Sequence, residues 1–172
     1  MKLLTLLSLL AVAATVRAET TLTMTGVHNC CKGCANGIIK AAADFKDVTV
    51  TPEGKKVTIV SKKKSDAKKV AEAIIAAGYF GTIEGDESAS KSASKPATAS
   101  KPEAKLTKAT VSGVHLCCQK CATAATDAVK SVAGVTKYEI VSKAESFTVE
   151  GEFAKADLVA ALNSAGFAGD IK

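Results

Sequence analysis

Aromatic side chains are scarce in this sequence, which has no tryptophan, two tyrosines and five phenylalanines. So few aromatic residues offer no stacking platform for bases. We therefore expect no nucleic-acid partner, although the formal net charge is +6. The densest basic run, Lys62–Lys64, is interpreted as a solvated turn before a helix. No apolar run after residue 18 is long enough to cross a bilayer, which argues against stable membrane insertion as a pump or channel.

Signatures of catalysis are missing as well. The sequence shows no paired carboxylates, no nucleophile beside a base and no glycine-rich phosphate loop. We therefore expect a protein that is not an enzyme and has no catalytic residues.

Residues 1–18 have the layout of a signal peptide. The short basic start Met1-Lys2 is followed by an apolar run from Leu3 to Val16, and small residues stand where a signal peptidase cuts. The run is too short for a permanent transmembrane helix. We expect cleavage before Glu19 and a soluble exported protein, either periplasmic or secreted.

The rest of the chain consists of two copies of one sequence repeat. The stretch from Gly26 to Cys34 recurs from Gly113 to Cys121. Between the copies, residues 86–105 are rich in Ser, Ala, Lys, Thr and Pro and have nothing to bury, which predicts a disordered linker. The sequence thus predicts two small domains, 19–85 and 106–172, acting as tethered beads.

Each copy shows the same order of elements. In the first, strands are expected at 20–27, 48–51, 56–60 and 79–84, a helix from Lys32, and a second helix capped by Ser65 and ended by Gly78. Pro52-Glu53-Gly54 is expected to be the hairpin turn. In the second, strands are expected at 106–114, 135–141, 146–150 and from Phe167, with helices at 119–132 and 154–165. Strand-helix-strand-strand-helix-strand predicts two α+β, ferredoxin-like βαββαβ domains.

All six cysteines and both histidines lie in the two repeated stretches, each of which reads His-x-Cys-Cys-x-x-Cys. The candidate metal ligands are Cys31, Cys34, Cys118 and Cys121, with Cys30, Cys117, His28 and His115 as further candidates. An odd number of cysteines in each cluster leaves one thiol over, which argues against a simple disulfide framework. The start of the first helix favours thiolates. Soft thiolates select Cu(I), Zn(II) or similar ions, while three sulfurs and one imidazole form a tetrahedral zinc set.

The order of elements and the Cys-x-x-Cys step together resemble the heavy-metal-associated domain family, the copper-chaperone-like modules, over nearly all of both repeats. The spacing from Cys121 to Gly134-Val135 is similar to the family's, and Cys34 to Asp47-Val48 has the same spacing without the glycine. The resemblance implies that Cys31 with Cys34, and Cys118 with Cys121, are the metal-binding pairs. Val27 and Val114 replace the family's methionine, and a longer loop adds the upstream Cys and His.

These observations predict a metal carrier, buffer or scavenger that binds about one Cu(I) or Zn(II) ion per domain and exchanges it with a metal-donor or acceptor protein. A thiol-disulfide redox protein is the alternative, because Cys-x-x-Cys at a helix start also lowers a thiol pKa. A structural role for the clusters as cross-links also remains open. Tyr79, Phe80 and Phe167 are expected in the core, with a lid over the metal as the alternative.

Overall fold

A computed structural model of the chain describes residues 19–84 and 105–172. The predicted signal peptide and all of the predicted linker except Lys105 lie outside the described residues. Within the described ranges, no helix combines the length and the apolar character needed to cross a membrane.

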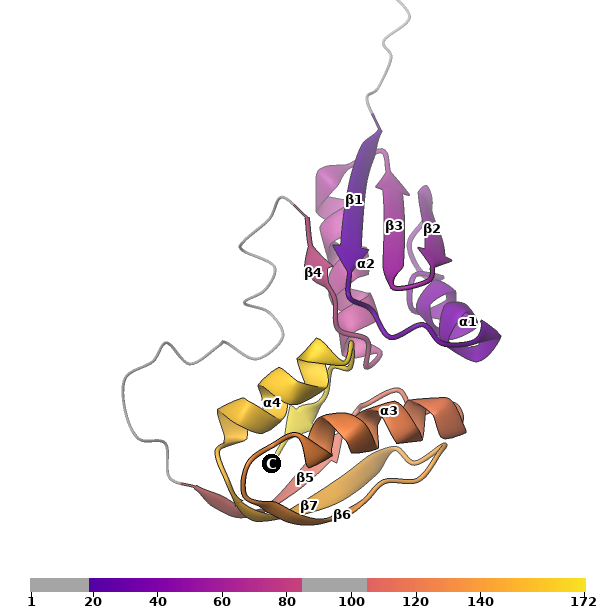
Figure 1. Cartoon of the computed structure of the whole chain (residues 1–172). Coiled ribbons are helices and arrows are strands. Elements are labelled where there is room, and N and C mark those ends of the chain that lie inside the picture. Colours follow the sequence, from indigo (N-terminus) through magenta and orange to yellow (C-terminus); the bar gives the residue numbers. More distant parts are fainter. Residues whose placement is uncertain (1–18, 85–104) are drawn as a thin grey trace, which may run out of the picture.

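The first half contains one four-stranded antiparallel sheet and two helices (Figure 1). The elements in chain order are β1 (Thr20–Thr25), α1 (Lys32–Ala41), β2 (Val48–Glu53), β3 (Lys56–Ser61), α2 (Lys64–Ala76) and β4 (Thr82–Ile83). The strand order is β2-β3-β1-β4, so the two strands that follow the helices lie at the edges. This is the predicted βαββαβ arrangement.

The second half repeats the arrangement. Its elements are β5 (Leu106–Ser112), α3 (Gln119–Lys130), β6 (Val135–Glu139), β7 (Ser146–Phe153), α4 (Lys155–Ser164) and β8 (Asp170–Ile171). The strand order β6-β7-β5-β8 matches that of the first half position for position. The expected fold class, two ferredoxin-like α+β domains, is therefore confirmed.

Alternation of apolar and polar residues explains why one face of each sheet is buried. Leu22 and Met24 on β1 and Val57 and Ile59 on β3 point to the same side, where the helices cover them. From α1, Cys34 and Ile38 enter this core one helical turn apart. A candidate metal ligand, Cys34, is thus also a fully buried core residue, and this fixes its position.

Several local predictions were wrong. The hairpin turn is Gly54-Lys55, because Glu53 pairs with Lys56 and both Pro52 and Glu53 belong to β2. Gly54 supplies the positive φ of 55° that this tight turn requires. Helix α2 begins one residue before Ser65, and its N-cap is Lys63.

The last strand of each half is shorter than predicted. Only Thr82–Ile83 and Asp170–Ile171 are extended in register with the sheets. The residues just before them, Tyr79 and Phe167, instead pair with each other across the two halves as an isolated bridge. Each last strand therefore joins its own sheet late, after the segment that contacts the other half.

The two halves contact each other through equivalent segments (Figure 1). The Phe80 and His28 amides both donate to the Gly166 carbonyl, at 2.9 and 3.2 Å, and the Ala168 amide donates to the Gly78 carbonyl at 3.1 Å. The two halves thus contact each other, whereas the sequence predicted two domains that act separately on a linker. The contact places the loop between β1 and α1 close to the loop between β5 and α3.

Candidate metal centre

Both cysteine clusters lie at a strand-to-helix turn. Cys31 is the N-cap of α1 and Cys118 is the N-cap of α3, each in an extended backbone conformation. The next cysteine in each cluster, Cys34 or Cys121, falls in the first turn of the helix and is fully buried. The first turn of a helix has amide groups without helical partners, so each turn supplies N–H groups beside the sulfurs.

All six sulfur atoms meet in one place between the halves. Ten of the sulfur pairs have Sγ–Sγ distances of 3.6 to 4.0 Å. Six of these ten pairs join a cysteine of the first half to one of the second. The contact between Cys34 and Cys121, at 3.6 Å, is buried. The structure therefore contains one joint group of six thiols, where the sequence predicted two separate sites.

The histidine of each half stacks on an aromatic ring of the other half. His28 stacks on Phe167 with ring centroids 4.3 Å apart, and His115 stacks on Tyr79 with centroids 4.5 Å apart. The Tyr79 hydroxyl also donates a 3.0 Å hydrogen bond to the Cys34 carbonyl. Tyr79 thus links α1 of its own half to the histidine of the other.

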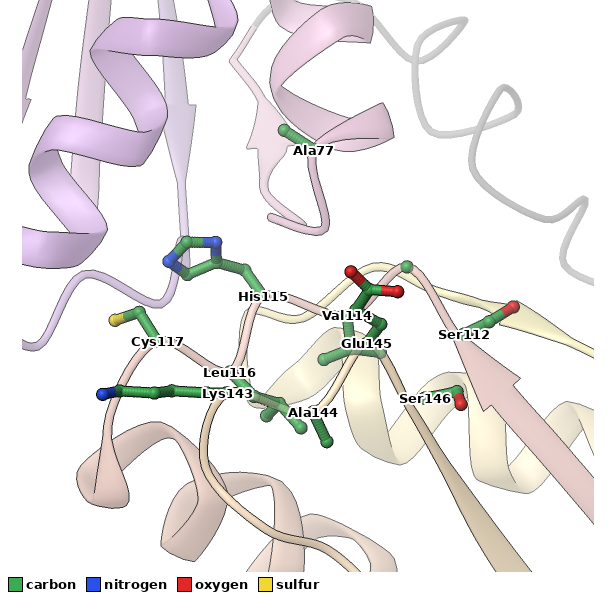
Figure 2. A pocket seen from close by; sticks show the side chains of 11 residues that line it. Ala77, Ser112, Val114, His115, Leu116, Cys117, Lys143, Ala144, Glu145 and Ser146 are labelled. Carbon is green, nitrogen blue, oxygen red and sulfur yellow. The ribbon is translucent and has the colours of Figure 1, made fainter.

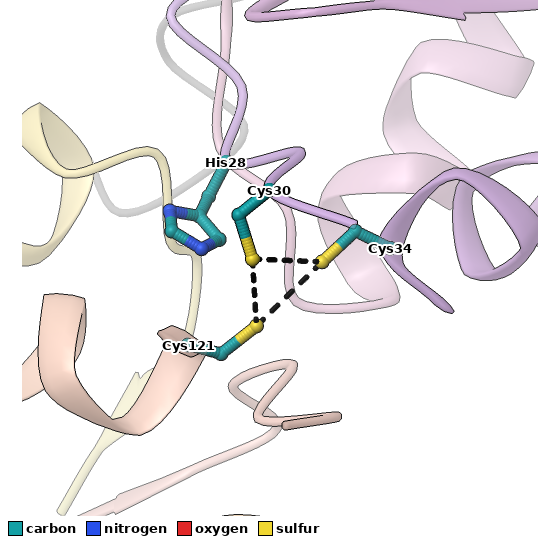
Figure 3. A group of neighbouring side chains, drawn as sticks. All are labelled: His28, Cys30, Cys34 and Cys121. Atoms are coloured by element: carbon teal, nitrogen blue, oxygen red, sulfur yellow. Dashed lines mark hydrogen bonds between the residues drawn. The ribbon is translucent and has the colours of Figure 1, made fainter. Parts of the chain in front are cut away.

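The histidines present unused nitrogen atoms near the thiols. Nε2 of both His28 and His115 is buried without a hydrogen-bond partner. Burial lowers the pKa of each imidazole, which favours the neutral form that binds metals. His28 lies within 4.8 Å, ligand atom to ligand atom, of Cys30, Cys34 and Cys121 (Figure 3). A buried nitrogen lacking a partner carries an energetic cost that a bound ion would remove.

The six thiols differ in acidity. Burial raises the pKa of Cys30, Cys117 and Cys121. Hydrogen bonds, first from the Cys121 backbone, lower the pKa of Cys118 to about 6. At Cys34 burial favours the thiol, but hydrogen bonds from the Cys30 backbone and neighbouring thiols outweigh it and lower the pKa. At neutral pH the metal-free protein therefore holds a thiolate at Cys118 beside thiols whose pKa is raised, an arrangement that limits charge repulsion at these distances.

This pattern predicts selective alkylation of the reduced, metal-free protein. Because the thiolate is the nucleophile, iodoacetamide should modify Cys118 first. Its rate should rise with pH, be half-maximal near pH 6, the value of its pKa, and level off above neutrality. Peptide mass spectrometry after short exposures would measure this. Cys118→Ser should remove the fast phase, and a fast phase located at Cys117 would contradict the assignment.

An open cleft leads from solvent to the edge of the thiol group. It is lined by Ala77 of the first half and by residues 112–117 and 143–146 of the second (Figure 2). His115, Cys117 and Lys143 are among its lining residues. Cys117 is only partly buried, so one of the six thiols borders this cleft.

Comparison with known protein families gives a match to the second copy. Residues 110–168 match the model of the heavy-metal-associated domain family. The matched range contains the second cysteine cluster and helix α3. The first half has the same fold and the same repeated motif, although the family model does not match it.

Two solved structures show limited likeness. The N-terminal soluble domains of Bacillus subtilis CopA are 15% identical, with 90% of this chain and 95% of that chain covered and a TM-score of 0.33. The first two RRM domains of yeast poly(U)-binding protein Pub1 are 10% identical, with 89% and 98% covered and a TM-score of 0.26. Neither likeness is close enough to carry an argument about function. No curated protein matches the chain.

The structure brings all eight candidate ligands into one region, the second half contributing His115, Cys117, Cys118 and Cys121 and the first half contributing the other four. Their roles as ligands stay predictions. The sequence predicted Tyr79 and Phe167 as core residues, with a lid over the metal as the alternative, and it did not predict the stacking on the histidines. Both are buried, but each also stacks on a histidine of the other half. Their repetition at equivalent positions, after Gly78 and Gly166, was the one available signal.

Proposed function

We propose that this chain is an exported, non-enzymatic binder of soft transition-metal ions that carries, buffers or scavenges Cu(I) or Zn(II). The observation that supports the proposal most is the meeting of six thiol groups from both halves within 4.0 Å of their neighbours. Thiolates in such density select Cu(I) and Zn(II) over Mg(II) and Ca(II). The heavy-metal-associated domain at 110–168 supports the same chemistry.

Thiols this close together also suit the alternative, a thiol-disulfide redox protein. All six cysteines are free, which is the state that a metal site and a reduced redox site share, so the histidines distinguish the two functions. The orphaned Nε2 atoms of His28 and His115 have a use as metal ligands and none in disulfide exchange. We further propose that the signal peptide is cleaved and that the protein exchanges its ion with a donor or acceptor protein.

The test is elemental analysis of protein purified under reducing conditions, with free thiols counted before and after a chelator is added. We expect bound copper or zinc and thiols that react only after chelation. Changing both Cys31→Ser and Cys34→Ser should remove at least half of the bound metal. The matched control is Ser61→Ala with Thr25→Ala. These hydroxyls bond to the Lys63 amide and the Thr82 carbonyl and not to a thiol, so the metal content should stay unchanged. A reversible disulfide without metal affinity would favour the redox alternative.

A further inference from the structure

The positions of the six sulfur atoms define an octahedron. Ten pairs are within 4.0 Å, and the two adjacent-residue pairs, Cys30 with Cys31 and Cys117 with Cys118, are each within 4.8 Å. These are the twelve edges of an octahedron. The three pairs that remain stand opposite each other: Cys30 with Cys117, Cys31 with Cys121, and Cys34 with Cys118.

Four triangular groups of sulfurs cover alternate faces of this octahedron. They are Cys30-Cys34-Cys121, Cys30-Cys31-Cys118, Cys31-Cys34-Cys117 and Cys117-Cys118-Cys121. Every cysteine occurs in two of the four groups, and any two groups share one cysteine. The other four faces form an equivalent set, related to the first by exchange of the two halves. Either set gives four three-sulfur sites in which each sulfur bridges two sites.

The size of the triangles suits a metal ion. Cys30-Cys34-Cys121 and Cys31-Cys34-Cys117 have all edges between 3.6 and 3.8 Å. An ion at the centre of such a triangle lies roughly 2.1–2.2 Å from each sulfur, the edge divided by √3, and a metal–thiolate bond is about 2.3 Å for zinc. Each of the other two triangles has one edge, between adjacent cysteines, for which the limit is 4.8 Å. No four sulfurs of an octahedron are mutual neighbours, so it offers no tetrahedral all-sulfur site for Zn(II), whereas a three-sulfur site suits Cu(I), which thiolates select.

We propose that the chain binds four Cu(I) ions as one cluster bridged by all six cysteine thiolates. This inference rests on the proposed metal-binding function. It adds the number of ions in the cluster and their identity. All six cysteines are thiolates in the cluster, so each cysteine that is still a thiol in the metal-free protein releases its proton as the Cu(I) ions bind. The cluster charge is −2 (four positive and six negative charges), and no electron is transferred. His28 lies beside the face formed by Cys30, Cys34 and Cys121, and Phe167 stacks on the ring of His28.

The experiment is an anaerobic titration of the full chain with Cu(I), followed by native mass spectrometry. We expect saturation at four copper ions, with the metal-free and four-copper species dominating at intermediate ratios because the sites share sulfurs. X-ray absorption should show three sulfur neighbours and a short copper–copper distance. Zn(II), which needs a nitrogen or water to complete each site, should not reach four ions.

The most informative variant replaces both cysteines of one opposite pair. Every face takes one sulfur from each opposite pair, so Cys30→Ser with Cys117→Ser leaves no face intact. This variant keeps both Cys-x-x-Cys pairs and both buried cysteines, and it should fold and bind two Cu(I) at most. As the control, Cys30→Ser alone keeps two of the four faces.

The outcomes separate the two proposals. Four ions in the wild type and two at most in the double variant support the cluster. Saturation of the wild type at two independent ions would overturn the cluster and leave the metal-binding function standing. Failure to bind Cu(I) or Zn(II) at all would overturn both.

Discussion

Replacing Gly166 with alanine should separate the two halves while each remains folded. Gly166 has a φ of 84°, and a Cβ there would be 2.5 Å from the Gly26 carbonyl oxygen and 2.9 Å from the Val27 carbonyl carbon. These atoms are backbone of the other half and cannot move aside without breaking the contact. Bound Cu(I) should then fall from four ions to two at most, and the metal-free protein should have a larger radius of gyration by X-ray scattering.

The control for this variant is Gly54→Ala. Gly54 also has a positive φ, 55°, but a Cβ there meets nothing within 4 Å. Both variants carry the backbone strain of a left-handed residue, roughly 1–2 kcal/mol, and only Gly166→Ala adds the collision. An unchanged radius and an unchanged copper count in Gly166→Ala would show that the halves do not meet through this segment. Gly78, which faces Gly113 and His115 in the equivalent way, should behave like Gly166.

Phe153→Ala should destabilise the second half strongly. Phe153 is fully buried at the end of β7, and truncation of a buried phenylalanine costs about 3–5 kcal/mol because a cavity remains. In metal-free protein, hydrogen exchange measured by mass spectrometry should show the loss of protection concentrated in residues 105–172. With Cu(I) bound, part of the protection should return, because a ligand that binds only the folded protein stabilises it.

Val141→Ala is the matched control for this truncation. Val141 lies in the same half and is 57% exposed, so its replacement should change the free energy of unfolding by no more than about 0.5 kcal/mol. Equal loss of protection in both halves of metal-free Phe153→Ala would mean that they unfold as one unit even without metal.

Local patterns in the sequence were enough to predict the fold. Alternation in β1 and β3 and the helical spacing of Cys34 and Ile38 report which face is buried. The hairpin turn was misplaced because Pro52 can occupy a strand that lies at the edge of the sheet, as β2 does. Because Pro52, Glu53 and Gly54 all suit a turn, the sequence leaves the position of the turn between β2 and β3 ambiguous by one or two residues.

The joint centre could not be predicted in the same way. Local periodicity says which residues share an element, and it says nothing of how two similar units meet. The bridge between Tyr79 and Phe167 and the stacking on His28 and His115 depend on contacts between residues of different halves, which are far apart in the sequence. The two copies of the motif are compatible with two separate metal sites and also with one shared metal site.

The pairing of the two halves on one chain has a consequence for dilute conditions. Two separate molecules that each supplied three thiols would have to associate before a six-thiol centre formed, and dilution would favour dissociation. Here the contact is intramolecular, and linked binding partners see each other at an effective concentration set by the linker, in the millimolar range for short flexible ones. Assembly of the centre should therefore be independent of protein concentration, however scarce the protein is.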